Sequence, residues 1–300
     1  MEQMENLEHC PLCDANEFSE FIKCKDHTVS HKTFQIVSCN QCGLLFTNPR
    51  PDTNTIGGYY QSEDYISHSN TRKGLISQLY HIVRNYTLRS KLRLIEGSHK
   101  PGSLLDVGCG TGEFLNTAKQ HHWNTTGIEP SQTAREFAIN TYGLHVFPPS
   151  HLEELKPASF QVITLWHVLE HVDQLNHYIE KLSTLLDSEG TLIVAVPNPD
   201  SWDACHYKTN WAAYDLPRHF YHFTPMTMKK LMSKHQLTIT KIKPMIFDSF
   251  YVAMLSSQYK NENKSLSVLR GFSIGALSNI RALFGKKNYS SLIYIIRKQN

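Results

Sequence analysis

The chain has 300 residues and a formal net charge of +3, which leaves room for one large domain and a small one. Apolar residues make up 40% and charged residues 19%, as in ordinary globular proteins. So small a net charge argues against a nucleic-acid partner held by its phosphates. There is no apolar run long enough to span a membrane and no basic-then-apolar leader, so we expect a cytoplasmic protein.

The cysteines gather near the N-terminus. Five of the seven fall in the first 42 residues, and four of these form two C-x-x-C pairs. Two such pairs can supply four thiolates in a tetrahedron, the arrangement that structural zinc prefers. Without an export signal, metal binding is favoured over disulfides. The sequence therefore predicts a zinc ribbon over residues 1–50, with Cys24 left as a free thiol. The predicted zinc ligands are Cys10, Cys13, Cys39 and Cys42.

Residues 51–100 are predicted to be a linker followed by N-terminal lid helices, because apolar residues recur at helical intervals from Gly74 to Ile95. Residues 101–300 alternate short apolar runs with amphipathic stretches, the pattern of a layered α/β domain. Helices can follow the first, second, fourth and fifth runs, which predicts an open, mostly parallel sheet. The predicted strands are Ser103–Val107, Thr125–Glu129, Leu144–Phe147, Val162–Trp166, Thr191–Val196, Thr238–Met245 and Leu292–Arg297.

A glycine-rich turn follows the first of these strands. Gly108, Gly110 and Gly112 permit unusual backbone angles and the close approach of a ligand. Asp106 stands two residues before the first glycine, where a pyrophosphate would be repelled and the amine of an amino-acid cofactor attracted. Glu129, at the end of the second strand, is placed to accept hydrogen bonds from two ribose hydroxyls. A nucleotide fold with another ligand, or one that has lost its cofactor, is the alternative.

Three segments carry a family resemblance: Leu105–Gly112, Gly127–Pro130 and Trp166–Val172. With them the chain resembles the class I S-adenosylmethionine-dependent methyltransferases, and among these the small-molecule enzymes related to the ubiquinone-biosynthesis O-methyltransferases. The resemblance covers roughly residues 59–300. It implies a seven-stranded Rossmann-like sheet with an antiparallel last strand and S-adenosylmethionine as cofactor.

The resemblance also implies roles for single residues. The turn would hold the methionine part, Glu129 the ribose, and residues 150–152 would lie by the adenine, while Tyr59-Tyr60 and Tyr65–His68 look like a lid strip. The expected cofactor-binding residues are Asp106, Gly108, Cys109, Gly110, Thr111, Gly112, Glu129, Pro130, Ser150, His151, Leu152, Trp166 and His167.

After the fourth strand, His167, Glu170 and His171 stand three and four residues apart, so one helical face can present all three. Three interpretations stay open here. His167 touches the cofactor while the other two are structural, or His171 is a general base for a hydroxyl acceptor. In the third, the group binds a divalent metal, because some relatives use Glu-x-x-Glu-His in this place; this chain has His167 where the first Glu would be.

Residues 198–224 form a long connection rich in Trp, Tyr and His at the edge where ligands bind. His219 is the alternative general base, and Arg218 is placed to hold an anionic group or to stack on a ring. The other interpretation is a purely structural lid. Further along, residues 266–287 have helical apolar spacing with basic flanks. We favour a cover over the substrate pocket or a dimer contact for this stretch, and a membrane surface is the alternative.

These features predict S-adenosylmethionine-dependent methyl transfer to a small-molecule acceptor, a sugar, nucleotide-sugar or polyketide-like compound, with O-methylation slightly favoured. One alternative is an RNA methyltransferase that grips its substrate with the ribbon. Residues 1–50 are net acidic, which counts against phosphate binding. The other alternative is a non-catalytic module that keeps the cofactor site. The protein is expected to be a monomer or a homodimer.

Overall fold

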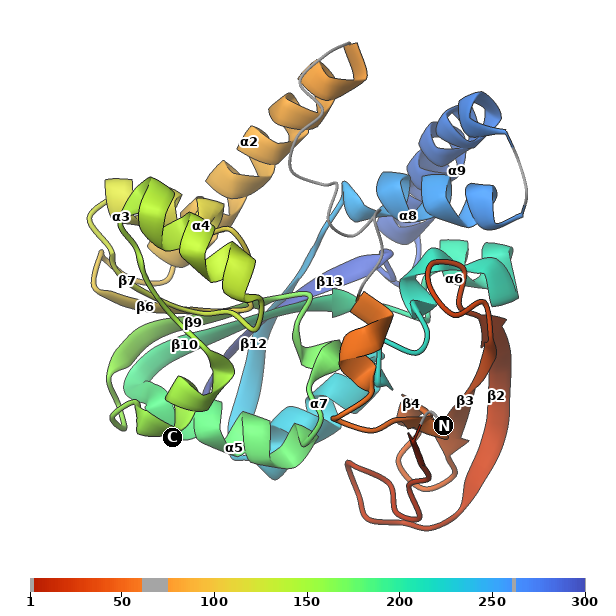
Figure 1. Ribbon diagram of the computed structural model, residues 1–300, viewed down its shortest axis with the longest axis horizontal. Helices are drawn as coiled ribbons and strands as arrows, with labels where there is room; N and C mark the ends of the chain where they lie inside the picture. The colour runs from red at the N-terminus through yellow and green to blue at the C-terminus, as the bar shows by residue number, and fades with distance from the viewer. Residues whose placement is uncertain (1–2, 61–74, 261–262, 300) are drawn as a thin grey trace.

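A computed structural model describes residues 3–60, 75–260 and 263–299 (Figure 1). Its centre is a seven-stranded sheet with the order β12-β13-β10-β9-β6-β7-β8. All neighbours pair in parallel except β13, which is antiparallel to both β10 and β12. The predicted sheet and its antiparallel last strand are thus confirmed. The strands are β6 (Ser103–Val107), β7 (Asn124–Ile128), β8 (His145–Phe147), β9 (Phe160–Trp166), β10 (Leu186–Pro197), β12 (Leu237–Pro244) and β13 (Ser291–Lys298).

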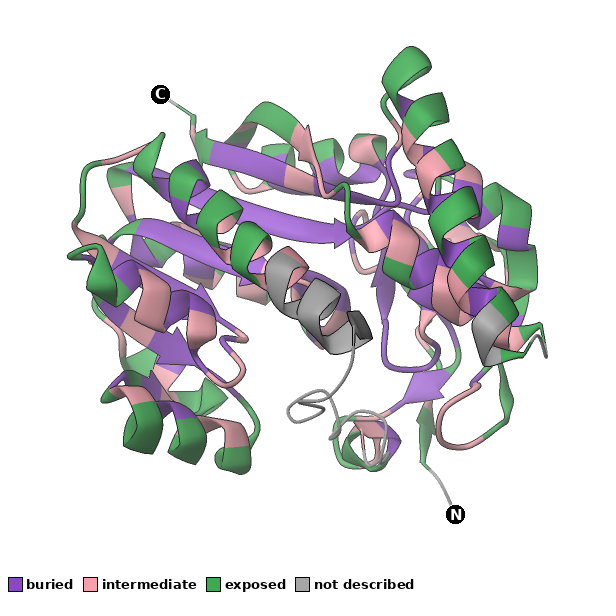
Figure 2. Cartoon of the chain, turned by 90° about the horizontal axis from the view of Figure 1, so that it is seen from above, coloured by how far each residue is buried: buried purple, intermediate pink, exposed green. Residues whose placement is uncertain are grey.

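Helices cover both faces of this sheet (Figure 1). On one face lie α2 (Leu75–Glu96), α3 (Glu113–Gln120) and α4 (Gln132–Tyr142), and on the other lie α5 (Leu175–Leu185) and α7 (Pro225–Lys234). Because both faces are covered, the central strands are buried on both sides and read as nearly continuous apolar runs. Figure 2 shows these strands as buried.

The helix ends follow from local sequence signals. The Ser131 hydroxyl accepts a hydrogen bond from the Ala134 amide at the start of α4, and Gly143 ends that helix in a left-handed conformation. At the start of α7, Thr224 and Thr227 form a reciprocal capping box with Pro225 in the first turn. These caps fix the points at which the chain returns to the sheet.

The N-terminal part forms its own sheet, with the order β11-β4-β3-β2. Its strands are β2 (Phe18–Lys25), β3 (Thr33–Cys39), β4 (Leu45–Thr47) and β11 (Tyr221–His222). The fourth strand comes from the histidine-rich connection, because Tyr221 pairs with Phe46 and His222 with Leu45. The N-terminal segment and this connection therefore share one sheet, and the domain boundaries at residues 50 and 100 stay a prediction. A two-stranded ribbon of β1 (Met4–Glu5) and β5 (Arg50–Pro51) lies beside it.

Between β12 and β13 the chain forms a helical hairpin of α8 (Asp248–Tyr259) and α9 (Lys264–Phe284). It stands at one end of the sheet, above the short helix α6 (Trp202–Tyr207) (Figure 1). Among the described residues, no helix combines the length and the apolar character needed to cross a bilayer.

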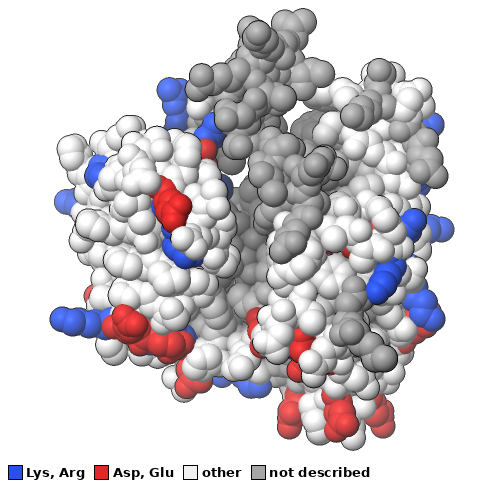
Figure 3. All heavy atoms as spheres, in the orientation of Figure 1, with Lys and Arg blue, Asp and Glu red and all other residues white. Residues whose placement is uncertain are grey.

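On the face shown in Figure 3, charged side chains of both signs are spread over the described residues. In Figure 3, acidic side chains gather along the lower edge of the visible face, while Lys and Arg lie scattered on both flanks. On the described part of this face they form no continuous basic field. This distribution agrees with the small net charge of the chain.

Candidate functional site

The glycine-rich turn joins β6 to α3, and its three glycines all have positive φ: 70° at Gly108, 55° at Gly110 and 82° at Gly112. A Cβ atom on Gly108 would lie 2.4 Å from a methyl group of Val168, and one on Gly112 would lie 2.7 Å from Leu144. A Cβ on Gly110 would meet nothing within 4 Å. Packing thus explains the first and third glycines, whereas Gly110 presents bare backbone to open space that a ligand can approach.

Two buried carboxyl groups flank this turn. Glu129 accepts hydrogen bonds from the Gly110 amide (2.8 Å) and the Ser131 amide (2.9 Å). Asp106 accepts one from the Thr164 hydroxyl (2.6 Å). Burial raises the pKa of Asp106 to about 7, although the Thr164 hydrogen bond and the nearby Lys91 oppose the shift. The carboxyl of Asp106 therefore takes up or releases its proton near neutral pH, and a cation bound beside it would favour the carboxylate.

The residues expected beside the adenine follow β8 in a 3₁₀ helix, Pro149–Glu154. The His151 ring stacks on Phe147 with 4.1 Å between the ring centroids, and Leu152 is buried. Cys109 packs behind the turn, where a Cβ on Gly127 would lie 2.7 Å from its sulfur. Burial raises the pKa of Cys109, so it stays an uncharged packing residue.

Lys91 is a site residue that the sequence did not reveal, because a lysine in an amphipathic helix gives no signal of its own. Its Nζ lies 4.4 Å from the centroid of the Trp166 ring, and burial lowers its pKa. The indole Nε1 of Trp166 is buried and finds no hydrogen-bond partner among the described residues. A cavity of about 360 Å³ opens here. Its lining includes Tyr86, Lys91, Leu94, Trp166, Phe247 and Asp248.

The expectation of one helical face for His167, Glu170 and His171 is wrong. His167 has a φ of 58°, and only a 3₁₀ turn, Leu169–His171, follows it. Its ring instead lies between two carboxylates, with Nε2 2.8 Å from Asp248 Oδ2 and Nδ1 3.2 Å from Glu170 Oε1. Burial acts against the shift, but Asp248 and Glu170 raise the pKa of His167 to about 10. His167 is therefore a cation in an ion pair.

The structure brings His171 and His219 together, with 4.5 Å between their ring centroids. The Nδ1 of His171 lies 3.0 Å from the Arg218 carbonyl oxygen and 3.0 Å from the Tyr60 hydroxyl, and the Nδ1 of His219 lies 3.0 Å from the Ala213 carbonyl oxygen. A carbonyl can only accept, so each Nδ1 is the donor in these contacts, which leaves Nε2 as the remaining ring nitrogen of each imidazole. The Nε2 of His219 lies 3.9 Å from Asp215 Oδ2. Burial and the neighbouring His171 lower the pKa of His219 well below its usual range. Both proposed bases thus share one place, although they are 48 positions apart in the chain.

Glu170 completes this cluster. It is buried, its Oε2 has no hydrogen-bond partner among the described residues, and it lies within 4.8 Å of ligand atoms of His171 and His219. One carboxylate and two imidazoles are a donor set that a divalent transition metal accepts. In the predicted trio of possible ligands, His219 therefore replaces His167.

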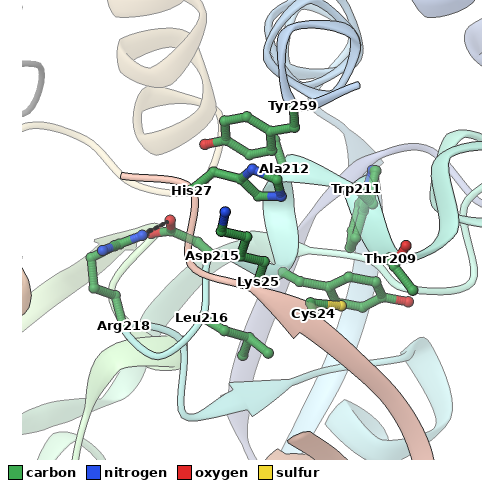
Figure 4. A pocket seen from close by; sticks show the side chains of 11 residues that line it. Cys24, Lys25, His27, Thr209, Trp211, Ala212, Asp215, Leu216, Arg218 and Tyr259 are labelled. Carbon is green, nitrogen blue, oxygen red and sulfur yellow. Dashed lines mark hydrogen bonds and ion pairs between the residues drawn. The ribbon is translucent and has the colours of Figure 1, made fainter. Parts of the chain in front are cut away.

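Arg218 was expected to hold an anionic group or to stack on a ring, and this expectation is wrong. Its guanidinium is buried and donates to Asp215 (2.6 Å), Asp26 (3.3 Å) and the carbonyl oxygen of Tyr59 (3.0 Å). Figure 4 shows Arg218 turned toward Asp215 in this way. Arg218 holds the connection against the N-terminal sheet. Of the predicted lid strip, Tyr60 contacts His171, while Tyr65–His68 lie outside the described residues.

The four paired cysteines meet at one point. Sulfur atoms lie 3.5 Å apart for Cys10 and Cys42 and 3.5 Å apart for Cys13 and Cys39, and all four are within 4.8 Å of one another. A zinc–sulfur bond of about 2.3 Å gives a sulfur–sulfur edge of about 3.8 Å in a tetrahedron. Burial raises the pKa of Cys42 to about 11, so four thiolates can coexist here only around a cation. All seven cysteines are free of disulfides, Cys24 included.

A family model described as a methyltransferase domain matches residues 80–242, more than half of the 300-residue chain. The chain therefore belongs to this methyltransferase family. Together with the seven-stranded sheet, the match makes it a class I S-adenosylmethionine-dependent methyltransferase. The predictions of an enzyme of this class and of its cofactor are confirmed.

Curated relatives and solved structures agree with this membership. A ubiquinone biosynthesis O-methyltransferase from Bradyrhizobium diazoefficiens is 23% identical over 203 residues, 59% of this chain and 78% of the relative. One from Rhodopseudomonas palustris is 23% identical over 161 residues, 48% of this chain and 62% of the relative.

Two solved structures share the fold. The magnesium protoporphyrin IX methyltransferase from Synechocystis PCC 6803, with bound SAH, is 14% identical with a TM-score of 0.54, covering 82% of this chain and 100% of the other. The geranyl diphosphate C-methyltransferase from Streptomyces coelicolor A3(2) is 14% identical with a TM-score of 0.51, covering 78% and 87%. At these identities the likeness shows the fold alone.

Proposed function

We propose that this protein transfers the methyl group of S-adenosylmethionine to a hydroxyl of a small-molecule acceptor, a sugar, nucleotide-sugar or polyketide-like compound. The observation that carries the proposal is the His171–His219 pair. Main-chain carbonyls hold both imidazoles through Nδ1, so in its neutral form each ring has an Nε2 that can accept a proton, which is what a general base for a hydroxyl requires. The names of the curated relatives, which are O-methyltransferases, support oxygen as the acceptor atom.

We assign the cofactor to the glycine-rich turn. Gly110 offers open space and Asp106 a carboxyl group for the methionine part. Glu129, whose Oε2 accepts from the Gly110 amide and whose Oε1 accepts from the Ser131 amide, is the residue that we assign to the ribose. Bound there, the cofactor supplies an electrophilic methyl group, and the chain's own task is to hold the acceptor in line and exclude water. The remaining residues of this proposed site are Gly108, Cys109, Thr111, Gly112, Pro130, Ser150, His151, Leu152, Trp166 and His167.

His171 is the base that we favour, because it is partly exposed whereas His219 is buried. In this arrangement the Nε2 of His171 takes the hydroxyl proton as the methyl–oxygen bond forms and the methyl–sulfur bond breaks. The ring of His219 packs edge to face against the ring of His171 and holds it in position. The proton then passes to solvent from His171.

The test is a turnover assay with methyl-labelled S-adenosylmethionine against a catechol, a nucleoside-diphosphate deoxysugar and a structured RNA fragment. We expect label on a hydroxyl of a small acceptor. His171→Ala should lower kcat by about 10²- to 10⁴-fold, the usual contribution of general-base catalysis, with cofactor affinity unchanged. The control is His177→Ala, an exposed histidine of α5, which should keep full activity. Faster labelling of RNA, or full turnover by both His171→Ala and His219→Ala, would reject the proposal.

We also propose that Cys10, Cys13, Cys39 and Cys42 bind one structural zinc ion. The sulfur spacing given above supports this, because it suits a tetrahedron of four thiolates and is too long for disulfides. Every position around the ion would be filled by protein. The zinc would therefore hold the N-terminal sheet together and take no part in the transfer.

A further inference from the structure

Helix α9 packs with its small residues inward and leaves its large apolar residues outside. On the inner face, a Cβ on Gly271 would lie 2.8 Å from Met254, and one on Gly275 would lie 2.8 Å from Phe250, so α8 and α9 touch almost backbone to backbone. Ser267 and Ser278 are buried on the same face. The usual arrangement of a helix on a globular surface, with its large apolar side chains in the core, is therefore reversed.

The outer face of α9 carries large apolar residues along most of its length, with the exposed Ser273 among them. Of 17 exposed large hydrophobic residues in the described chain, seven lie on this one helix, and Leu269 and Phe284 are 65% and 84% exposed. With 3.6 residues per turn they fall on a single face of roughly 140°. In Figure 2, exposed residues recur along this helix. The seven are Leu266, Leu269, Phe272, Leu277, Ile280, Leu283 and Phe284. A contiguous apolar surface of this kind marks a site of association.

Positive charge is concentrated beside this apolar face. Residues 248–288 contain six Lys and Arg and two acidic residues, a net charge of +4, so the remaining chain, at +3 in total, carries −1. Arg270 is exposed next to the apolar face on the helix, and Lys286 and Lys287 are exposed just beyond its end. The guanidinium of Arg281 lies 4.5 Å from the centroid of the Trp202 ring, on the α6 side. The part of the molecule with the most exposed apolar residues is thus also its basic part.

We infer that the outer face of α9 docks on an anionic lipid surface. An amphipathic helix lies in a membrane interface when its apolar side enters the acyl boundary and basic side chains meet anionic headgroups. A second copy of this chain docked face to face would bring the exposed Arg270, Lys286 and Lys287 near their own counterparts, and this repulsion opposes a symmetric dimer through α9. Phosphates of a nucleic acid would leave the apolar residues in water. The lipid surface alone matches both properties.

The hairpin also connects this face to the catalytic edge. Asp248, the first residue of α8, pairs with His167, and Phe247 and Asp248 line the cavity beside Trp166. The hairpin that carries the outer face of α9 thus also supplies part of the lining of this cavity. The inference does not depend on the identity of the acceptor.

The experiment is co-sedimentation of the full chain with vesicles of phosphatidylcholine and phosphatidylglycerol in a 3:1 ratio, and with vesicles of phosphatidylcholine alone. We expect binding to the anionic vesicles that weakens in high salt. The double variant Leu269→Gln/Phe284→Gln should lower the bound fraction about tenfold, and Lys286→Glu/Lys287→Glu should remove the preference for anionic vesicles. Phe137→Gln is the matched control, because Phe137 is 46% exposed on α4, away from this face.

Calorimetric binding of S-adenosylmethionine must stay unchanged in every variant, which shows that the fold is intact and separates this test from that of the methyl acceptor. The absence of vesicle binding by the unmodified protein would overturn the inference. A second result would also overturn it: the unmodified protein is a dimer by sedimentation equilibrium and binds no vesicles, and the double variant is a monomer. The outer face of α9 would then contact a second copy of the chain.

Discussion

Asp106 is a buried carboxyl whose charge depends on what binds beside it. Its pKa of about 7 means that, without cofactor, the Asp106 carboxyl is half protonated near neutral pH. The ammonium of the cofactor favours the carboxylate, so binding below pH 7 must first remove a proton. By the same shift, the empty protein loses stability as pH rises from about 4 to 7, because the folded carboxyl holds its proton longer than the unfolded one.

We therefore predict that the affinity for S-adenosylmethionine rises about tenfold between pH 6 and pH 8, measured by calorimetry. Asp106→Asn should bind more weakly and lose this pH dependence. If Glu129 holds the ribose as proposed, Glu129→Ala should also bind more weakly, but its affinity should keep the same pH dependence. If the affinity of Asp106→Asn for the cofactor still rose between pH 6 and pH 8, another group would be responsible for the pH dependence.

The sequence could predict which residues lie together when they belong to one local motif. It could not do so when residues far apart in the chain meet only in the folded protein. The sequence pointed to Asp106 and Glu129 because a strand, a turn and a helix fix them locally. It could not pair His171 with His219, since nothing local relates positions 48 residues apart. It misplaced His167 because the left-handed backbone at that residue ends the strand without starting a helix.

At the scale of elements, one ion pair joins the loop after β9 to the start of α8. The pKa of His167 is raised to about 10 in the folded state, against an ordinary value of 6.5. The pair with Asp248 therefore stabilises the fold fully below about pH 6.5, and this stabilisation is lost as pH rises through about 10.

Asp248→Asn should accordingly lower the free energy of unfolding by about 1–2 kcal/mol at pH 6 and have little effect at pH 10.5. The expected loss in the free energy of unfolding is small because solvent screens this ion pair. The side chains of His167 and Asp248 are 33% and 22% exposed. Urea unfolding at the two pH values measures the difference. Glu153→Gln, which removes the pairs of an exposed carboxylate with His177 and Lys181, should change stability little at either pH. Equal losses for Asp248→Asn at both pH values would contradict the assignment.

The long elements were predictable because apolar runs mark buried strands, and all seven strands of the main sheet fell where the runs predicted. The short ones were not. The two-residue strand β11 and the six-residue helix α6 are shorter than any periodicity can define. Only their partners in the N-terminal sheet and the hairpin give them regular structure.

At the scale of the molecule, the cysteine cluster belongs to the same core as the catalytic domain. One apolar cluster runs from Cys10 and Leu44 through Phe220 and Met228 to Leu165 of β9. The sequence could predict the two parts but not their fusion, because the β4–β11 pairing joins positions about 175 residues apart.

We predict one zinc per chain by elemental analysis, its loss in Cys39→Ser and its retention in Cys205→Ser, which changes an exposed lone cysteine. Because the core is shared, removing the metal should lower the melting temperature of the entire chain in a single calorimetric transition. Metal-free protein as purified, or two separate transitions in the zinc-bound form, would argue against this picture.

Arg218 links the N-terminal part of the chain to the connection at residues 198–224. Its buried guanidinium donates hydrogen bonds to Asp26, Asp215 and the main-chain carbonyl of Tyr59. These residues belong to the N-terminal part, the connection and the segment before α2. Leaving a buried charge without its partner costs several kcal/mol. A change in the N-terminal sheet that removes Asp26 would therefore need a matching change in the connection. Because His219 follows Arg218 directly, such a change would also reach the proposed acceptor site.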